Sequence, residues 1–231
     1  MEIKTAILVD GGYYRKRAHT IWGKKTAKER ADELERYCRL HLKDKYEGHR
    51  SLYRIFYYDC PPLGTTVYHP LTKQNVKLDG SDTYKWTVEF FKELVQKRKF
   101  ALRLGRLADN GNGYRLAPET VKKLCSGALL VGNLKESDFI FETKQKGVDM
   151  KIGIDIAHLS YKKLADQIIL IAGDSDFVPA AKIARREGVD FIIDAMGSHI
   201  ADDLLTHVDG FFSHWRDPRN KSDGKSEPAP K

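Results

Sequence analysis

The chain has 231 residues and is 41% hydrophobic, which is enough for one domain with a substantial core. Its formal charge of +8 favours polyanionic partners such as nucleic acid, because phosphate contacts release counterions. No apolar run approaches the roughly 20 residues that span a bilayer, so we expect no membrane partner. The three cysteines lie far apart without a C-x-x-C pair, which is typical of a reducing cytoplasm and predicts a cytoplasmic location.

Apolar runs that end at turn residues predict five strands, and helical periodicity separates most of them. The first run, residues 5–9, ends at Asp10-Gly11-Gly12, and the fourth ends at Asp174-Ser175-Asp176. We predict strands at 5–9, 52–59, 100–107, 167–173 and 189–195, and helices at 28–42, 83–97, 147–161, 177–188 and around 199–208. Residues 64–80 are predicted as a loop that carries substrate or partner contacts.

The predicted domain covers residues 1–215 and contains an excursion at about 109–138. The excursion holds turn residues and a short helix over 118–125 that starts at a proline. From residue 216 to 231 the sequence is polar, basic and proline-bearing, and we expect a disordered tail.

Strands that alternate with helices predict a mostly parallel sheet covered on both faces. Ligands bind such sheets beyond the carboxyl ends of the strands, near the point where the strand order reverses. With the strand order 3-2-1-4-5, the first and fourth strands are neighbours at that point. Their carboxyl ends carry Asp10 and Asp174, so the two acids are expected to lie together.

Each aspartate has a structural alternative to a role in chemistry. Asp10 could cap the following helix, and either Asp174 or Asp176 could cap the next one. One cap does not account for both of the latter carboxylates. Asp149 could simply complement the dipole of the helix predicted at 147–161. It lies at one edge of the apolar stripe of that helix and Asp155 lies at the opposite edge, so one ligand would not easily meet both. We prefer Asp149 for the site.

Four carboxylates in one place repel each other unless a cation neutralises them. Oxygen ligands favour Mg²⁺ or Mn²⁺ over Zn²⁺, and such an ion can activate water and stabilise charge on a phosphodiester. The eight histidines are scattered and form no H-x-x-x-H pair that would compete for this role.

The segments ILVDGGY, QKGVDMKIGIDIAHL and IILIAGDSDFVPAAKIA occur in an order that resembles the NYN domain, LabA-like branch, of the PIN-like superfamily. The resemblance extends from Thr5 to about Phe212. It implies a PIN-like three-layer α/β/α sandwich with a central, mostly parallel five-stranded sheet. It also implies a metal-dependent ribonuclease that hydrolyses phosphodiester bonds and uses Mg²⁺ or Mn²⁺. The implied catalytic residues and metal ligands are Asp10, Asp149, Asp174 and Asp176.

Residues near these acids are candidates for substrate binding. Tyr13 offers a ring for base stacking, and Arg15 and Lys146 offer charge for phosphates. Ser198 matches a polar position often found in the family after the fifth strand. Many relatives read D-G-x-N at the first motif, whereas Tyr13 occupies the asparagine position here, so an amide that could orient the substrate is missing.

Other enzyme classes fit less well. A haloacid-dehalogenase phosphatase needs a second aspartate where this chain has Gly12, a Toprim fold needs a glutamate where it has Asp10, and neither G-x-G-x-x-G nor G-K-[ST] occurs at a strand end. The open alternative is a non-catalytic module of the same fold that binds RNA or a protein. We expect RNA rather than DNA as the partner, and the sequence is also compatible with a homo-oligomer.

Overall fold

A six-stranded parallel sheet forms the centre of the computed structural model, which describes residues 2–43, 49–108, 111–200 and 202–215. Every neighbouring pair of strands in this sheet is parallel. From one edge to the other, the strands are β12 (Gly210–Phe211), β11 (Asp190–Asp194), β10 (Gln167–Ile171), β1 (Ile3–Asp10), β2 (Arg50–Asp59) and β5 (Phe100–Leu104). The order supposed for the five long strands is the one observed. The predicted count of five strands is corrected by β12, whose two residues are too few to produce a pattern.

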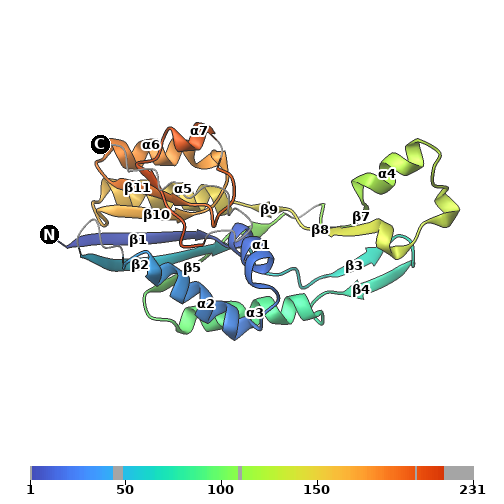
Figure 1. Ribbon diagram of the computed structural model, residues 1–231. Helices are drawn as coiled ribbons and strands as arrows, with labels where there is room; N and C mark the ends of the chain where they lie inside the picture. Colours follow the sequence, from blue (N-terminus) through green and yellow to red (C-terminus); the bar gives the residue numbers. More distant parts are fainter. Residues whose placement is uncertain (1, 44–48, 109–110, 201, 216–231) are drawn as a thin grey trace.

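Helices cover both faces of the sheet, which confirms the expected α/β/α sandwich (Figure 1). Helices α1 (Gly11–Trp22), α2 (Ala27–Leu40) and α3 (Asp82–Gln96) pack on one face, and α5 (Val148–Tyr161), α6 (Val178–Arg186) and α7 (Asp202–Leu205) pack on the other. Successive residues of β1 point to opposite faces, so Ile7 belongs to the first core and Leu8 to the second. The central strands are buried on both sides, which is why they read as continuous apolar runs.

A second structural unit, which we call the arm, comprises residues 66–77 and 111–142. It contains the hairpin of β3 (Thr66–His69) and β4 (Gln74–Lys77), the antiparallel pair of β7 (Gly113–Leu116) and β8 (Phe139–Glu142), the helix α4 (Pro118–Cys125) and the short helices η1 (Val131–Asn133) and η2 (Glu136–Asp138). The predicted loop at 64–80 is thus wrong, since it contains a hairpin whose turn uses Lys73 with a positive φ of 56°.

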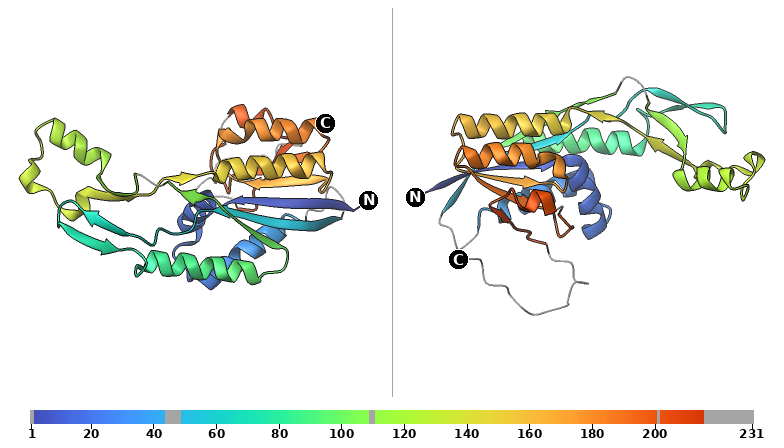
Figure 2. Two further views of the ribbon diagram at one scale, coloured as in Figure 1. Left: turned by 180° about the vertical axis from the view of Figure 1, so that it is seen from behind. Right: turned by 90° about the horizontal axis from the view of Figure 1, so that it is seen from above.

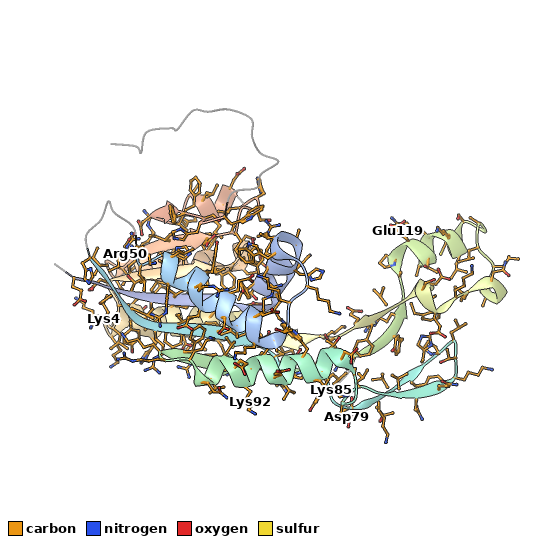
Figure 3. All side chains as sticks on the ribbon, turned by 60° about the horizontal axis from the view of Figure 1, so that its bottom comes forward. Lys4, Arg50, Asp79, Lys85, Lys92 and Glu119 are labelled. Carbon is orange, nitrogen blue, oxygen red and sulfur yellow. The ribbon has the colours of Figure 1, made fainter. Side chains whose placement is uncertain are left out.

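The arm projects from the side of the molecule where the strands of the sheet have their carboxyl ends (Figures 1 and 2). Its base is a two-residue antiparallel pairing of β6 (Arg106–Leu107) with β9 (Gln145–Lys146). Figure 3 shows Glu119 on the arm, at the opposite end of the molecule from Lys4 and Arg50. The first two residues of the predicted excursion, 109–110, lie outside the described part of the chain. The predicted tail at 216–231 also lies outside it.

In the described part of the chain, no helix combines the length and the apolar character that crossing a membrane requires.

Candidate active site

Three separate segments bring aspartates to the carboxyl edge of the sheet. Asp10 ends β1, and Asp174 follows β10 directly after Ala172 and Gly173. Strands β1 and β10 are parallel neighbours with Val9 opposite Ile171, so both acids leave the sheet at the same edge. Asp149 belongs to the first turn of α5, and Asp176 lies in the short helix η3 (Ser175–Phe177).

Asp10 combines a structural and an electrostatic role. Its carboxylate caps α1 by accepting a 3.1 Å hydrogen bond from the Tyr13 amide. Desolvation is the largest cause that raises the pKa of this partly buried carboxyl to about 6; the charges of Asp149 and Asp59 add to the rise, and the Tyr13 amide opposes it. The capping alternative is thus correct for Asp10, and it leaves a carboxyl that is costly to ionise.

Asp149 is coupled to the acids that follow β10. Burial raises the pKa of Asp149, and the charges of Asp174 and Asp176 add to this effect. Much of the Asp149 side chain stays accessible to solvent, so this desolvation is only partial. Gly147, two residues earlier, sets the entry into α5 with a φ of 79°. The coupling therefore runs from Asp10 through Asp149 to the pair after β10.

For Asp174 and Asp176 the sequence left open whether each caps a helix or belongs to a cation site. Asp174 caps η3 by accepting a 3.2 Å hydrogen bond from the Asp176 amide, while both side chains remain exposed. An open depression of about 440 Å³ lies at the carboxyl ends of β1 and β10, and its lining includes Asp10, Asp174, Lys16 and Ser175. The capping role accounts for Asp174, and the structure gives no such reason for a carboxylate at Asp176.

Asp59 is a site residue that the sequence reasoning left out. It ends β2, the other neighbour of β1, and its side chain is fully buried. Its carboxylate accepts hydrogen bonds from Arg15 and from the Tyr57 hydroxyl, both at 3.1 Å, and from the Cys60 amide at 2.8 Å. Desolvation nevertheless raises its pKa. Because these donors already bind the Asp59 carboxylate, its effect on Asp10 is to raise the pKa through its charge, and it also holds the Arg15 guanidinium in place.

The donor chemistry of the cluster fits a hard divalent cation. All four predicted ligands are carboxylates, the type of donor that Mg²⁺ and Mn²⁺ prefer. Desolvation and the neighbouring carboxylates raise the pKa values of Asp10 and Asp149, so a bound cation would favour their ionised forms. Across the ranges that the structure describes, no three acidic, histidine or cysteine side chains are gathered closely enough to form a ready-made metal site. The acids are thus coupled at the same edge, and closing on a cation would require side-chain movement.

Tyr13 and Ser198 form one structural unit beside the depression. The Tyr13 hydroxyl donates a 2.6 Å hydrogen bond to the Ala195 carbonyl and also contacts the Ser198 side chain, while burial raises its pKa. The Tyr13 ring lies against Gly173, where an added Cβ would be 2.6 Å from it. Tyr13 therefore ties together the carboxyl ends of β1, β10 and β11, and only part of its ring faces the depression.

The two cationic candidates lie in different settings. Arg15 forms an ion pair with Asp59 at 3.1 Å, so part of its hydrogen-bonding capacity is used inside the protein. Lys146 is exposed in β9 at the base of the arm, three residues before Asp149. Asp155, which the sequence placed outside the site, accepts hydrogen bonds from the Tyr58 hydroxyl at 2.8 Å and from Arg103 at 3.1 Å.

Comparison with known proteins gives one family match, over part of the chain. No curated protein sequence matches the chain significantly. A family model does match, and the matched segment includes Asp149, Asp174, Asp176 and Ser198, whereas Asp10 precedes it. Residues 112–215 match the model of the NYN domain, a family of the PIN-like superfamily.

Proposed function

We propose that this protein is a metal-dependent nuclease that hydrolyses phosphodiester bonds in RNA. The observation that supports this most directly is the electrostatic coupling of Asp10, Asp149, Asp174 and Asp176 at one edge of the sheet. Carboxylates whose ionisation is disfavoured in this way are typical of sites that hold a cation or perform acid–base chemistry. The NYN match over the segment with three of these acids supports a nuclease rather than another hydrolase.

The four aspartates would hold Mg²⁺ or Mn²⁺, and such an ion supplies polarisation of the phosphodiester and of the attacking water. The protein's own residues place the substrate. Lys16 lines the depression beside Asp10 and Asp174, where it can hold a non-bridging phosphate oxygen. Tyr13 fixes the separation of the strand ends that present the acids. Water adds to phosphorus and one P–O bond breaks, which leaves a phosphate monoester on one product and a hydroxyl on the other.

The preference for RNA is the finer part of the proposal. The net charge of +8 favours any polyanion and does not distinguish the two nucleic acids. The preference rests on the resemblance of the three acidic motifs to ribonucleases of the NYN type. Labelled RNA and DNA strands of identical sequence, digested side by side, would measure it as a ratio of cleavage rates.

The decisive experiment compares two substitutions at opposite ends of one strand. Asp174 follows β10, whereas Asp166 precedes it and accepts a 2.8 Å hydrogen bond from the Lys4 amide. We expect Asp174→Asn to abolish cleavage of labelled single-stranded RNA in Mg²⁺ or Mn²⁺. Asp166→Asn removes the same charge at the far edge of the sheet, and this protein should still cleave the RNA. EDTA should stop cleavage by the unmodified protein.

Binding measured in parallel distinguishes the alternative function. RNA that is bound but not cut by the unmodified protein in either metal would refute the nuclease proposal for these substrates. That result would indicate a non-catalytic RNA-binding module of the same fold. Equal cleavage by Asp174→Asn and the unmodified protein would show that the acids are not the catalytic centre.

A further inference from the structure

A second concavity opens directly beside the acids and has no role in the chemistry described so far. It has a volume of about 720 Å³ and lies between α1, the loop after α1 and the start of α3. Gly12 and Lys16 line both this pocket and the depression at the acids, so the two concavities are neighbours. The volume falls within the range of about 300–1,000 Å³ that is usual for pockets that bind small ligands or parts of larger ones.

The charge of this pocket is one-sided. Five cationic side chains and one acidic side chain, Asp82, line it, and the cations are Arg15, Lys16, Lys24, Lys25 and Arg30. Three of the cations have acidic partners: Arg15 pairs with Asp59, and Lys25 and Arg30 both pair with Glu33. Lys16 and Lys24 form no ion pair with the residues that the structure describes, and both are exposed. Their charges are therefore available to an anionic ligand.

The pocket lining also offers an aromatic ring. Trp86 of α3 lines the pocket, and its indole N–H already donates a 3.0 Å hydrogen bond to the Lys25 carbonyl. One side of the ring is stacked on Phe90 at a centroid separation of 5.0 Å and an interplanar angle of 13°. With its polar group satisfied, the indole has only π and apolar surface to present to a ligand. A nucleic-acid base is the ligand that combines such a surface with a neighbouring phosphate.

We propose that this pocket binds an unpaired nucleotide of the RNA strand next to the bond that is cut, with its base against Trp86 and its phosphate at Lys24. Lys16 then bridges the bound nucleotide and the phosphate at the acids, because it lines both concavities. The inference rests on the proposed nuclease function and specifies its substrate as single-stranded RNA. Paired bases are held in their stack and present no free face to Trp86.

Charge reversal at two lysines tests the phosphate contact. Lys24 lines the pocket and not the depression, whereas Lys92 lies on the outer side of α3 and is also exposed (Figure 3). We expect Lys24→Glu to weaken binding of a fluorescent single-stranded RNA in EDTA by about 10-fold, and to lower the slope of log affinity against log salt by about 0.7. Lys92→Glu makes the same change in net charge and should alter affinity less than 2-fold.

Intrinsic fluorescence tests the base contact. The chain has three tryptophans, and stacking of a base on Trp86 should quench the emission when a short RNA is added in EDTA. Trp86→Phe keeps an aromatic ring against Phe90 and should lose this quenching, whereas Trp22→Phe should retain it.

Equal affinity of the Lys24→Glu and Lys92→Glu proteins, or quenching that persists in Trp86→Phe, would overturn the assignment of the pocket. If metal-dependent cleavage survives in those proteins, the proposed nuclease function stands and only the pocket assignment fails. If the unmodified protein binds no RNA, both proposals fail together.

Discussion

Substitution of Asp10 by asparagine should make the metal-free protein more stable at neutral pH. Burial raises the pKa of Asp10 from its ordinary value of 3.8 to about 6, so the folded state opposes its ionisation. One pKa unit corresponds to about 1.4 kcal/mol, which gives an upper limit of about 3 kcal/mol. Because solvent reaches part of this side chain, about 1–2 kcal/mol is the expected gain in the free energy of unfolding. Asparagine can still cap α1 by accepting the hydrogen bond from the Tyr13 amide.

The pH dependence provides the stricter test. Between pH 3.8 and about 6 the folded protein binds a proton at Asp10 that the unfolded chain has released. The stability of the unmodified protein should therefore fall as pH rises through this window, and the advantage of Asp10→Asn should appear over the same range. Urea unfolding in EDTA at pH 4 and pH 7.5 would measure both values. The Asp166→Asn protein serves as the control and should change by less than about 0.5 kcal/mol at either pH.

Two results would refute this reasoning. One is an Asp10→Asn protein that is no more stable than the unmodified protein at pH 7.5. The other is a gain of the same size at pH 4, which would assign the effect to packing rather than to charge. A confirmed gain, together with lost cleavage in metal, would indicate that the acid is retained for function at a cost in stability.

Three further changes have defined outcomes. Gly173→Ala places a methyl group 2.6 Å from the Tyr13 ring and should cost about 1–3 kcal/mol in urea unfolding; an unchanged midpoint would mean that the ring is free to move. Tyr37→Phe removes the 2.5 Å hydrogen bond to the buried Asp194 carboxylate and should cost about 1.5–3 kcal/mol. A smaller loss would argue that His41 and the Met196 amide are sufficient to support that charge. Mg²⁺ at 100 times its Kd should raise the Tm by about 5–10 °C in scanning calorimetry. Asp174→Asn should abolish this rise. Equal shifts in both proteins would contradict the role of Asp174 in binding the metal.

The sheet was predictable because its strands are buried on both faces. Residues 6–9 and 168–171 have apolar side chains at successive positions, and the acids that follow them mark the carboxyl edge. The neighbouring positions of Asp10 and Asp174 followed from the strand order alone, which the structure confirms. Convergence of Asp149 did not follow from the strand order, since it depends on where α5 begins, at a glycine with positive φ.

Elements without a strong pattern escaped prediction for physical reasons. Helix α1 begins with two glycines, which have poor helix propensity, and buries only Gly11, Tyr14 and Ala18. Its stability comes from the Asp10 cap and from packing on the sheet, neither of which leaves a periodic signal. Asp59 is followed by Pro61-Pro62, which is typical of a simple turn, but its position at the end of a strand next to β1 was the informative feature. The pocket formed by α1 and α3 joins segments about 60 residues apart, so no local pattern could reveal it.

Because the base of the arm is only a two-residue pairing, we expect the arm to open at a lower free energy than the central sheet. Inside the arm, the ring of His69 packs 4.2 Å from that of Tyr114 and 5.2 Å from that of Phe139, while the joining ladder of β6 and β9 has two residues in each strand. Segments with few buried contacts open with free energies well below that of global unfolding. Amide hydrogens in β3 and β7 should therefore exchange with solvent long before those in β1 and β10. The arm can loosen and re-form while the sheet that presents the aspartates stays intact.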